Sequence, residues 1–291
     1  MVCIIRKGII LAGGHATRLK PITNVISKHL MPIYNKPMIY YPLSNLIQAG
    51  IRDYLIITNP EYLSLYKKLL GDGKKLGLRI RYKIQSKPLG LPHAFILGEK
   101  FINNEPVCLN LGDHIFFGDQ VSKLIKKNIQ NFLKTTIFVF KHKNPKDYGV
   151  INFDKNFRPL KIVEKPIITK SKYIICGLYI YDENVVEYTK KLKFSKRKEL
   201  EISDLNNLYL KKKMLSIEKI NSNNCWIDAG TPEKISLASN KICTMESKRK
   251  YIGMIEWESF KQGFISQSQY EKFIDVYKDN YYSEMLKLKL Q

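Results

Sequence analysis

A loop with two glycines follows the first apolar segment of the chain, and it holds the earliest residues that could do chemistry. Residues 8–12 are apolar, Gly13 and Gly14 come next, and Arg18 follows in the same loop. Backbone N–H groups of a glycine loop can approach a polyanion, and an arginine adds positive charge. Lys28 supplies a second cation ten residues after Arg18, so the two could flank one phosphate. The spacing fits neither a Walker A loop nor a dinucleotide motif, and the plainer alternative is an ordinary turn.

The elements that must position this loop alternate along the chain between strands and helices. Apolar or alternating runs predict strands at residues 8–12, 54–58, 79–84, 107–111, 135–141, 149–153, 159–163 and 173–181. Helical spacing predicts helices at residues 38–49, 61–70, 93–101, 183–192 and 201–212. Pro42 indicates that the regular part of the first helix starts near that residue. This order predicts an α/β fold with a doubly wound sheet, and the fully apolar first strand indicates parallel pairing.

The pattern changes near residue 232. Beyond it we expect only helices, with a break over residues 252–263 and then a polar tail that carries tyrosines. The predicted domains are therefore an α/β domain at residues 1–231 and a helical C-terminal appendage at residues 232–291.

Composition and cysteine use restrict the class of protein. The chain has 291 residues, of which 44% are hydrophobic and 26% charged, and this mix is typical of a soluble globular protein. No apolar run approaches the roughly 20 residues of a membrane helix, so we expect neither a membrane span nor a secretory signal. The cysteines are odd in number and widely spread, which favours reduced thiols in a cytoplasmic protein. They are Cys3, Cys108, Cys176, Cys225 and Cys243.

The net charge of +23 comes from 49 Lys and Arg against 26 Asp and Glu. Alone, it would suggest a nucleic acid or another polyanion as partner. The basic residues instead form short separate clusters at residues 196–198, 211–213 and 248–250, and no nucleic-acid-binding module is recognisable. We therefore expect solvated lysine-rich faces, small anionic substrates, and no nucleic acid or membrane as partner.

Short motifs follow one another in a fixed order along nearly the whole chain. They include Lys7-Gly-Ile-Ile-Leu-Ala-Gly-Gly14, Thr17-Arg18-Leu19, Ser27-Lys28, Leu111-Gly-Asp113, Tyr148-Gly-Val150, Glu164-Lys-Pro166, Glu199-Leu-Glu-Ile202 and Trp226-Ile-Asp228. As an ordered set they resemble the sugar-nucleotide pyrophosphorylases, and most closely the glucose-1-phosphate thymidylyltransferases that open dTDP-rhamnose synthesis. The resemblance implies a Rossmann-like doubly wound mixed sheet with the helical appendage, and a homotetramer in which the appendage is an oligomer or regulatory region.

The activity that the resemblance implies is nucleotidyl transfer. A phosphate oxygen of glucose 1-phosphate attacks the α-phosphorus of dTTP, and dTDP-glucose and pyrophosphate are the products. Both substrates are anions, so cations and Mg²⁺ must offset their repulsion and hold their geometry. No protein nucleophile is needed, which agrees with the lack of a convincing Ser/His/Asp or Cys/His arrangement in the sequence.

The resemblance also assigns roles to single residues. Arg18 and Lys28 would clamp the triphosphate and stabilise the charge that develops on the α-phosphoryl group. The implied nucleotide site consists of Leu11, Gly13, Gly14, Thr17, Gln85, Gly90 and Asp113. The implied sugar-phosphate site consists of Tyr148, Gly149, Glu164, Lys165, Ile175 and Arg197. Asp113 and Asp228 would hold Mg²⁺, an ion that prefers oxygen ligands.

Several of these residues have plainer interpretations when they are taken alone. Asp113 and Asp228 follow apolar runs and could cap turns at strand ends, because nothing local shows that they meet. Glu164 and Lys165 could form a surface ion pair, which contributes little to stability. Arg197 could be one more solvated cation of its basic cluster.

Four positions depart from the family pattern and leave the substrate open. Ala16 stands at a usual glycine, and it would cost about 1 kcal/mol if that position needs a positive φ. Ser86 and Leu89 change the loop that closes over the base, and His114 replaces an asparagine near the sugar. Gln85 can offer a donor and an acceptor to a pyrimidine, or could simply be exposed before a turn.

Three other functions stay open. The chain could be another sugar-1-phosphate nucleotidyltransferase, with UTP or a different sugar, or a catalytically inactive regulatory homologue. The segment 255–260 matches the family's inter-subunit regulatory region poorly, so the resemblance does not assure feedback control. A nucleic-acid-binding function rests only on the net charge.

Overall fold

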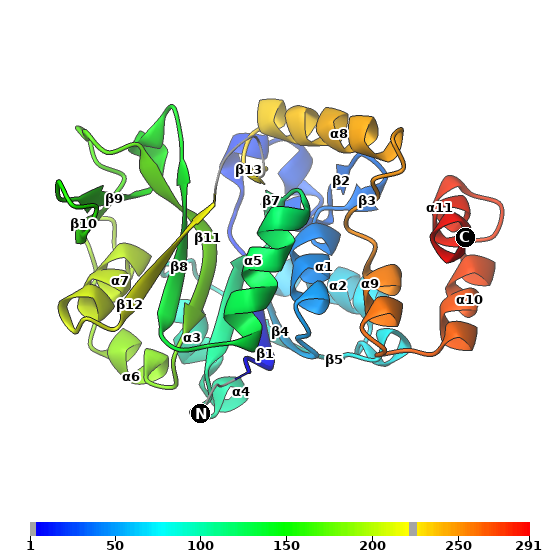
Figure 1. The fold of residues 1–291 in the computed structure, drawn as a ribbon, viewed down its shortest axis with the longest axis horizontal. Coiled ribbons are helices and arrows are strands. Elements are labelled where there is room, and N and C mark those ends of the chain that lie inside the picture. Colours follow the sequence, from blue (N-terminus) through cyan, green and yellow to red (C-terminus); the bar gives the residue numbers. More distant parts are fainter. Residues whose placement is uncertain (1–3, 221–225) are drawn as a thin grey trace.

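A large mixed sheet forms the centre of the computed structural model, which describes residues 4–220 and 226–291 (Figure 1). Its nine strands are β1 (Lys7–Ala12), β4 (Asp53–Thr58), β5 (Arg79–Ile84), β6 (Val107–Leu111), β8 (Thr135–Lys141), β9 (Gly149–Phe153), β10 (Pro159–Glu164), β11 (Tyr173–Tyr181) and β12 (Leu215–Ile220). They follow the order β10-β9-β11-β6-β1-β4-β5, and β8 pairs with both β11 and β12. The fold class predicted from the sequence is confirmed.

Most parallel pairs lie in one half of this sheet, and in the other half β12 runs parallel to β8. Strand β1 lies between β4 and β6, β5 adds to β4, and all of these pairs are parallel. Strand β11 runs antiparallel to β6, β8 and β9, so the sheet as a whole is mixed. The predicted parallel pairing of the first strand is therefore confirmed, and its apolar sequence follows from having neighbours on both edges and cover on both faces.

Helices cover both faces of the sheet. Ile10 of β1 belongs to a core shared with α1 (Tyr40–Gln48), α2 (Leu63–Leu70) and α5 (Asp119–Gln130). Its neighbour Ile9 belongs to the opposite core, which contains residues of α3 (His93–Leu97), α4 (Glu99–Ile102), α6 (Val185–Lys190) and α7 (Ile202–Lys211). Successive side chains of a strand point to opposite faces, so this split is what a doubly wound sheet requires.

Pro42 lies in the first turn of α1, where a missing N–H is tolerated. The helix expected at residues 93–101 is two short helices, α3 and α4, which meet at Gly98.

Two small sheets stand next to the carboxyl edge of the parallel strands. One pairs β2 (Pro32–Ile33) with β3 (Lys36–Pro37), and the other pairs β7 (His114–Phe116) with β13 (Trp226–Asp228). Ile33 and Ile115 of these sheets share a core with Ala238 of α8 (Pro232–Glu246). Helix α8 thereby holds β13 close to the end of β6.

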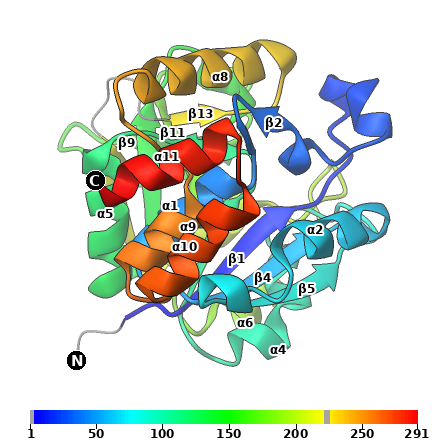
Figure 2. The same ribbon diagram turned by 90° about the vertical axis from the view of Figure 1, so that its right-hand side faces the viewer.

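The chain beyond Pro232 forms only helices, as predicted. After α8 these are α9 (Ile255–Lys261), α10 (Gln267–Val276) and α11 (Tyr281–Leu290), and Figure 2 shows them on the side of the molecule next to α1. The predicted break over residues 252–263 is wrong, because α9 occupies its centre. Buried Ile255 and Glu256 stabilise this helix, with the hydroxyl of Tyr282 donating to the Glu256 carboxylate at 2.5 Å. The position of the domain boundary stays a prediction.

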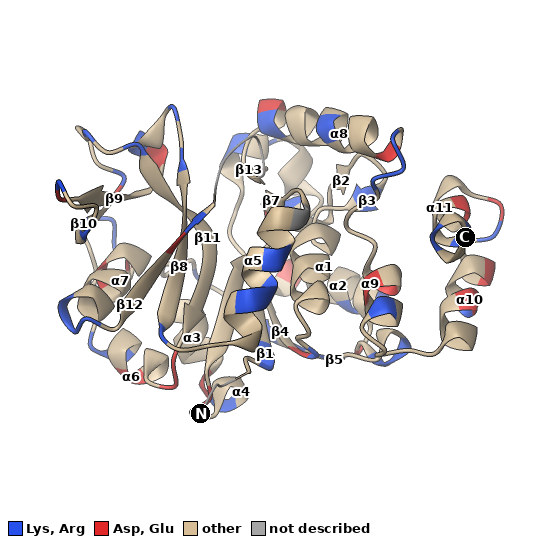
Figure 3. Ribbon diagram, viewed as in Figure 1, with Lys and Arg blue, Asp and Glu red and all other residues tan. Residues whose placement is uncertain are grey.

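Surface charge and cysteines agree with the expectations for the described residues. Lys and Arg are spread over α5, α7, α8 and several loops instead of forming one stripe (Figure 3). No helix of the described residues is long and apolar enough to cross a membrane. Cys108 and Cys176 are buried free thiols and Cys243 is an exposed one, whereas Cys3 and Cys225 lie outside the described residues.

Candidate active site

A cavity of about 320 Å³ opens where the parallel strands end. It collects most of the residues that the sequence analysis assigned to a site. These are Leu11, Gly13, Arg18, Lys28, Asp113, Tyr148, Gly149, Glu164, Lys165, Ile175, Arg197 and Asp228. A smaller hollow of about 190 Å³ shares Leu11 and Gly13 with it and adds Gly14, Gln85 and Gly90. Thr17 lines neither space and is exposed in a 3-10 turn, Thr17–Leu19.

Strand ends explain this convergence. Gly13 follows β1, Asn59 follows β4, Gln85 follows β5, and Gly112 and Asp113 follow β6. Because the carboxyl ends of parallel strands meet at one edge of a sheet, these positions form a single rim. The cavity therefore lies where open α/β sheets bind their ligands.

The glycine loop is braced by Asn59. The Gly14 N–H donates to Oδ1 of Asn59 at 2.9 Å, and Nδ2 of Asn59 donates to the Gly14 carbonyl at 3.2 Å. The N–H of Gly14 is thus already engaged within the protein. A Cβ at Gly13 would lie 3.0 Å from Oε1 of Gln85, so the glycine allows the amide to approach the loop. Ala16 has φ 44°, so this position adopts the left-handed conformation that the sequence left open.

Asp113 forms an ion pair with Lys28 just beyond the C-terminal end of β6. The Lys28 Nζ to Asp113 Oδ2 distance is 2.5 Å, and both side chains are 15% exposed. Burial alone would raise the pKa of Asp113, but Lys28, His114 and His29 bring it well below its usual range. Burial and the neighbouring Lys28 lower the pKa of His29 to about 3, so this imidazole is neutral at physiological pH. Asp113 therefore faces the cavity as a carboxylate.

Asp228 reaches the same cavity through a short antiparallel pair. Strand β13 pairs with β7 so that Asp228 stands opposite His114, and the Ala229 N–H donates to the Asp113 carbonyl at 2.8 Å. Asp113 and Asp228 both line the cavity, so the two strand-end aspartates lie at one place in the fold. Arg18 lies close to Asp228, since a Cβ at Gly230 would be 2.9 Å from the Arg18 guanidinium and 3.7 Å from Oδ2 of Asp228.

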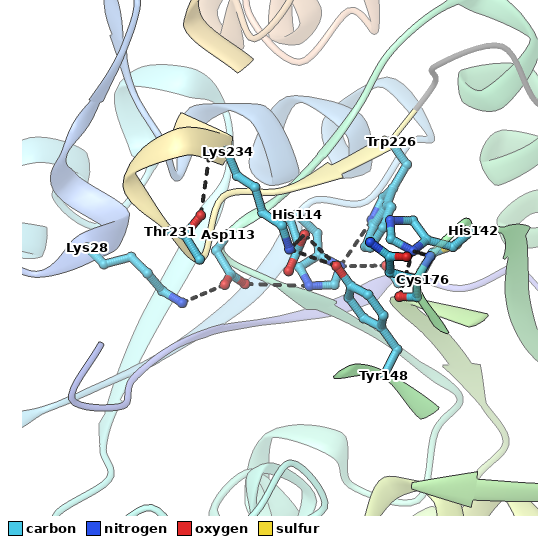
Figure 4. Close-up of polar contacts among 11 residues, drawn as sticks. Lys28, Asp113, His114, His142, Tyr148, Cys176, Trp226, Thr231 and Lys234 are labelled. Carbon is cyan, nitrogen blue, oxygen red and sulfur yellow. Dashed lines mark hydrogen bonds and ion pairs between the residues drawn. The ribbon is translucent and has the colours of Figure 1, made fainter. Parts of the chain in front are cut away.

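Lys234 was missed by the sequence analysis, although it contacts Asp228 directly. Its Nζ donates to Oδ1 of Asp228 at 2.6 Å and to the Tyr148 hydroxyl at 2.8 Å, and Tyr148 donates to the same Oδ1 at 2.9 Å. Figure 4 shows Lys234 and Tyr148 pointing toward one another, with Lys28 reaching Asp113 from the other side. Thr231 before Pro232 is a helix-start signal that would have placed Lys234 in the first turn of a helix that begins shortly after Asp228.

The two carboxylates suit a divalent cation that prefers oxygen. Lys28 contacts Oδ2 of Asp113 and Lys234 contacts Oδ1 of Asp228, so each carboxylate keeps a second oxygen. Among the described residues, no group of three or more His, Cys, Asp or Glu side chains could hold a metal. Phosphate oxygens of a substrate would have to complete the coordination, as is usual for Mg²⁺.

Glu164 and Gly149 form a polar wall on the other side of the cavity. The Ser203 hydroxyl donates to Oε2 of Glu164 at 2.6 Å, and a Cβ at Gly149 would lie 3.3 Å from that oxygen. Burial raises the pKa of Glu164 despite the Ser203 hydrogen bond. Glu164 is therefore anchored inside the cavity and is not half of a surface ion pair with Lys165, which is exposed.

Arg197 forms ion pairs with two glutamate side chains. Its Nη2 lies 2.7 Å from Oε2 of Glu201 and 3.1 Å from Oε2 of Glu199. The Arg197 side chain is 39% exposed, and these two contacts hold its guanidinium at the cavity wall.

Gln85 is buried, with 6% of its surface exposed, so the alternative of an exposed glutamine is wrong. Its Nε2 lies 3.1 Å from Nδ1 of His93. The following loop, which contains Ser86, is held by the Leu200 N–H donating to the Leu89 carbonyl at 2.9 Å. A Cβ at Gly90 would lie 2.0 Å from the Leu200 carbonyl oxygen. Gly90 therefore serves the close approach of two chain segments.

His114 is buried in the floor of the cavity. Its Nδ1 lies 2.6 Å from the carbonyl oxygen of Cys176 and 3.2 Å from the indole Nε1 of Trp226. The ring packs edge-on against Trp226 with 5.2 Å between centroids, and a Cβ at Gly177 would lie 2.3 Å from it. Its Nε2 faces Oδ1 of Asp113 at 3.7 Å. This position is fixed by packing, so the residue shapes the floor.

Comparisons with known proteins agree with this geometry. A family model described as nucleotidyl transferase matches residues 7–245. A glucose-1-phosphate thymidylyltransferase of Neisseria meningitidis is 45% identical over 281 residues, which cover 96% of this chain and 98% of that protein.

Two solved structures share the fold. A putative glucose-1-phosphate thymidylyltransferase from Bacillus anthracis in complex with a sucrose has a TM-score of 0.74 and 37% identity, over 81% of this chain and 94% of that one. A UDP-glucose pyrophosphorylase complexed with UDP-glucose has a TM-score of 0.73 and 26% identity, over 83% of this chain and 99% of that one.

Proposed function

Since the chain belongs to the nucleotidyl transferase family, among the glucose-1-phosphate thymidylyltransferases, we propose that it converts dTTP and glucose 1-phosphate to dTDP-glucose and pyrophosphate. The chain is a nucleotidyltransferase, and the substrates of such an enzyme are a sugar phosphate and a nucleotide. The single observation that carries the proposal is that Asp113 and Asp228, each paired with a lysine, line one cavity together with Arg18.

The nucleotide occupies the part of the cavity nearest the glycine loop. Gln85 is buried beside Gly13 and would offer its amide to the edge of the thymine, with the loop that contains Ser86 and Leu89 beside it. Arg18 and Lys28 lie at the rim where the triphosphate would end, and their charge would offset the charge on its oxygens. Leu11 and Gly14 complete this half of the site.

The sugar phosphate occupies the opposite part. The Glu164 carboxylate would accept hydrogen bonds from sugar hydroxyls, and Tyr148, Gly149 and Ile175 line the same wall. Lys165 and Arg197 would contact the phosphate. Arg197 would have to share its guanidinium between the phosphate and Glu201, with which it forms an ion pair.

The reaction needs positioning and charge stabilisation only. A phosphate oxygen of glucose 1-phosphate forms a bond to the α-phosphorus of dTTP while the bond from that phosphorus to the bridging oxygen of pyrophosphate breaks. We propose that Mg²⁺ bound by Asp113 and Asp228 supplies charge neutralisation at the phosphate oxygens. Lys28 and Arg18 would bind the phosphates and hold them in line.

The proposal extends to the pathway step, the cellular compartment and the oligomeric state of the enzyme. We propose that the reaction opens dTDP-rhamnose synthesis in the cytoplasm, where free thiols such as Cys108 and Cys176 stay reduced. We also propose a homotetramer in which residues 232–291 form contacts between subunits. Exposed apolar side chains on α10 and α11 support this, with Val276 72% and Tyr281 48% exposed.

Pyrophosphate release measured over a panel of substrates tests the proposal. The panel combines dTTP, UTP, ATP and GTP with the 1-phosphates of glucose, galactose and mannose, with and without a chelator. We expect the fastest release from dTTP with glucose 1-phosphate, its loss with the chelator and its return with Mg²⁺. A preference for a purine triphosphate, or no release from any pair, would contradict the proposal.

A further inference from the structure

Resting on this proposed function, we infer that Lys234 is a built-in counter-cation of Asp228, which keeps divalent-metal affinity low until the nucleotide arrives. Lys234 is a positioning residue in this account. It acts on the metal site through Asp228 and Tyr148.

The contacts of Lys234 occupy one side of the Asp228 carboxylate. Its ammonium lies 2.6 Å from Oδ1 of Asp228, and the Tyr148 hydroxyl donates to the same oxygen at 2.9 Å. The ammonium also lies 2.8 Å from the Tyr148 oxygen, so the three groups form a closed triangle. The Asp228 side chain is only 12% exposed and that of Lys234 31%, which limits screening of this pair by water.

The position of Lys234 in its helix points to a specific role. Thr231 caps α8 by accepting from the Lys234 N–H at 3.4 Å, so Lys234 lies in the first turn. The positive end of the helix dipole disfavours a cation there. The ion pair with the Asp228 carboxylate compensates for this cost. The Lys234 ammonium in turn neutralises the negative charge of Asp228 before any metal binds.

The other carboxylate has a matching partner. The Lys28 ammonium contacts Oδ2 of Asp113 at 2.5 Å. In this cavity, therefore, two ammonium groups balance the two carboxylates that would hold a metal. A divalent cation that enters alone must compete with these ammonium groups for the same oxygens.

A nucleoside triphosphate changes this balance. Its phosphate oxygens attract the Lys234 ammonium, which can leave Oδ1 of Asp228 for a phosphate oxygen and free that carboxylate oxygen. By thermodynamic linkage, nucleotide then raises the metal affinity more in the natural protein than in a variant without the ammonium. Metal and nucleotide are expected to enter together.

Binding of Mn²⁺ alone, followed by electron paramagnetic resonance, tests this inference on the full chain. Lys234→Met and Lys234→Gln remove the charge and should bind Mn²⁺ at least about fivefold more tightly than the natural protein in the absence of nucleotide. Lys234→Arg keeps the charge and should change the affinity by less than about twofold. Lys248→Met is the matched control, because Lys248 is an exposed lysine shortly after α8.

Addition of dTTP completes the test. The difference between Lys234→Met and the natural protein should shrink to less than about twofold. Unchanged or weaker Mn²⁺ binding in both uncharged variants without nucleotide would overturn the inference alone. A natural protein that binds no Mn²⁺ even with dTTP, or in which Asp228→Asn leaves such binding intact, would overturn the proposed metal site as well.

Discussion

The backbone N–H of Ala229 donates to the carbonyl oxygen of Asp113 at 2.8 Å. This hydrogen bond extends the pairing of β7 with β13, each only three residues long, and it brings Asp228 to the end of β6. The two acidic residues of the cavity are therefore joined by backbone geometry and not by a flexible loop. The proposed metal site depends on this junction.

Gly177 leaves room for the His114 ring at the floor of the cavity because it has no side chain. It has φ +66°, and an added Cβ would lie 2.3 Å from the His114 ring, which is itself fixed by the Cys176 carbonyl. Gly177→Ala should lower the free energy of unfolding by about 3 kcal/mol, as overpacking adds to backbone strain. Urea unfolding measures this change.

Gly263→Ala is the control for the part of the stability loss that comes from backbone strain at a positive φ. Gly263 has φ +69° with open space around an added Cβ, so the same substitution should cost only about 1 kcal/mol. Equal losses in the two variants would show that the contact with His114 contributes nothing.

Ala16 stands in the glycine loop where the family usually has glycine, and its backbone conformation predicts an effect on stability. Its φ of 44° and ψ of 45° are left-handed, a conformation that glycine adopts without a Cβ penalty. Ala16→Gly should raise the free energy of unfolding by about 0.5 to 1 kcal/mol. Ala238→Gly, in the right-handed α8, should lower it by about 1 kcal/mol or more. A loss of stability in Ala16→Gly would contradict the conclusion that alanine is strained at this position.

Gln85 is expected to select the base. Gln85→Leu keeps the volume but removes both hydrogen-bonding atoms, and it should lower kcat/KM for dTTP about 10- to 100-fold. Discrimination against ATP should fall as well. The control is Gln120→Leu, an exposed glutamine of α5. Steady-state kinetics that stay unchanged in Gln85→Leu would place the base elsewhere.

Glu258 makes stability depend on pH. Burial raises its pKa to about 7, with Lys261, Lys289 and Lys126 opposing the shift in part, and its Oε2 has no hydrogen-bond partner in the part of the chain that the structure describes. A raised folded-state pKa gives stability that is present below the unfolded value of about 4.5 and is lost as pH rises through about 7.

Between pH 5 and pH 8 the natural protein should thus lose about 2 kcal/mol more stability than Glu258→Gln. Urea unfolding at both pH values measures the difference. The exposed Glu271 of α10 provides the control variant, Glu271→Gln, which should follow the natural protein. Parallel losses in Glu258→Gln and the natural protein would contradict the raised pKa.

Most of the sheet could be predicted from the sequence because its strands carry strong local signals. Strands β1, β4 and β6 are apolar runs, and β11 is a long one, so their bounds agree with the predictions within a residue. The glycine loop at the end of β1 was predicted for the same reason, because a strand end marks the sheet edge without any knowledge of distant contacts. The role of Asp113 at the end of β6 came from the family resemblance.

Other elements could not be predicted from local pattern. In α9, the polar residues Glu256 and Ser259 are buried and glycines flank the segment, so its sequence has the pattern of a break. Strand β7, like its partner β13, forms only by pairing with a segment far away in the sequence. The helical spacing of Val121, Ile125 and Ile129 in α5, in contrast, was a usable signal that was overlooked.

The contacts inside the site show the same division. Lys234 and Asn59 act through side-chain contacts with residues brought near by the fold, and neither belongs to a motif of the sequence analysis. Gly90 was assigned to the nucleotide site from the sequence, but its contact with Leu200, like the contact of Gly177 with His114, requires tertiary structure. Sequence thus predicted which residues gather, and the structure supplied how they are held.

Anomalous diffraction from a crystal of the protein with dTTP and Mn²⁺ tests the central claim most directly. The account predicts a single manganese peak in the cavity, with a carboxylate oxygen of Asp113 and one of Asp228 each within about 2.5 Å of it. A peak bound by only one of these two aspartates, or by residues outside this cavity, would contradict it.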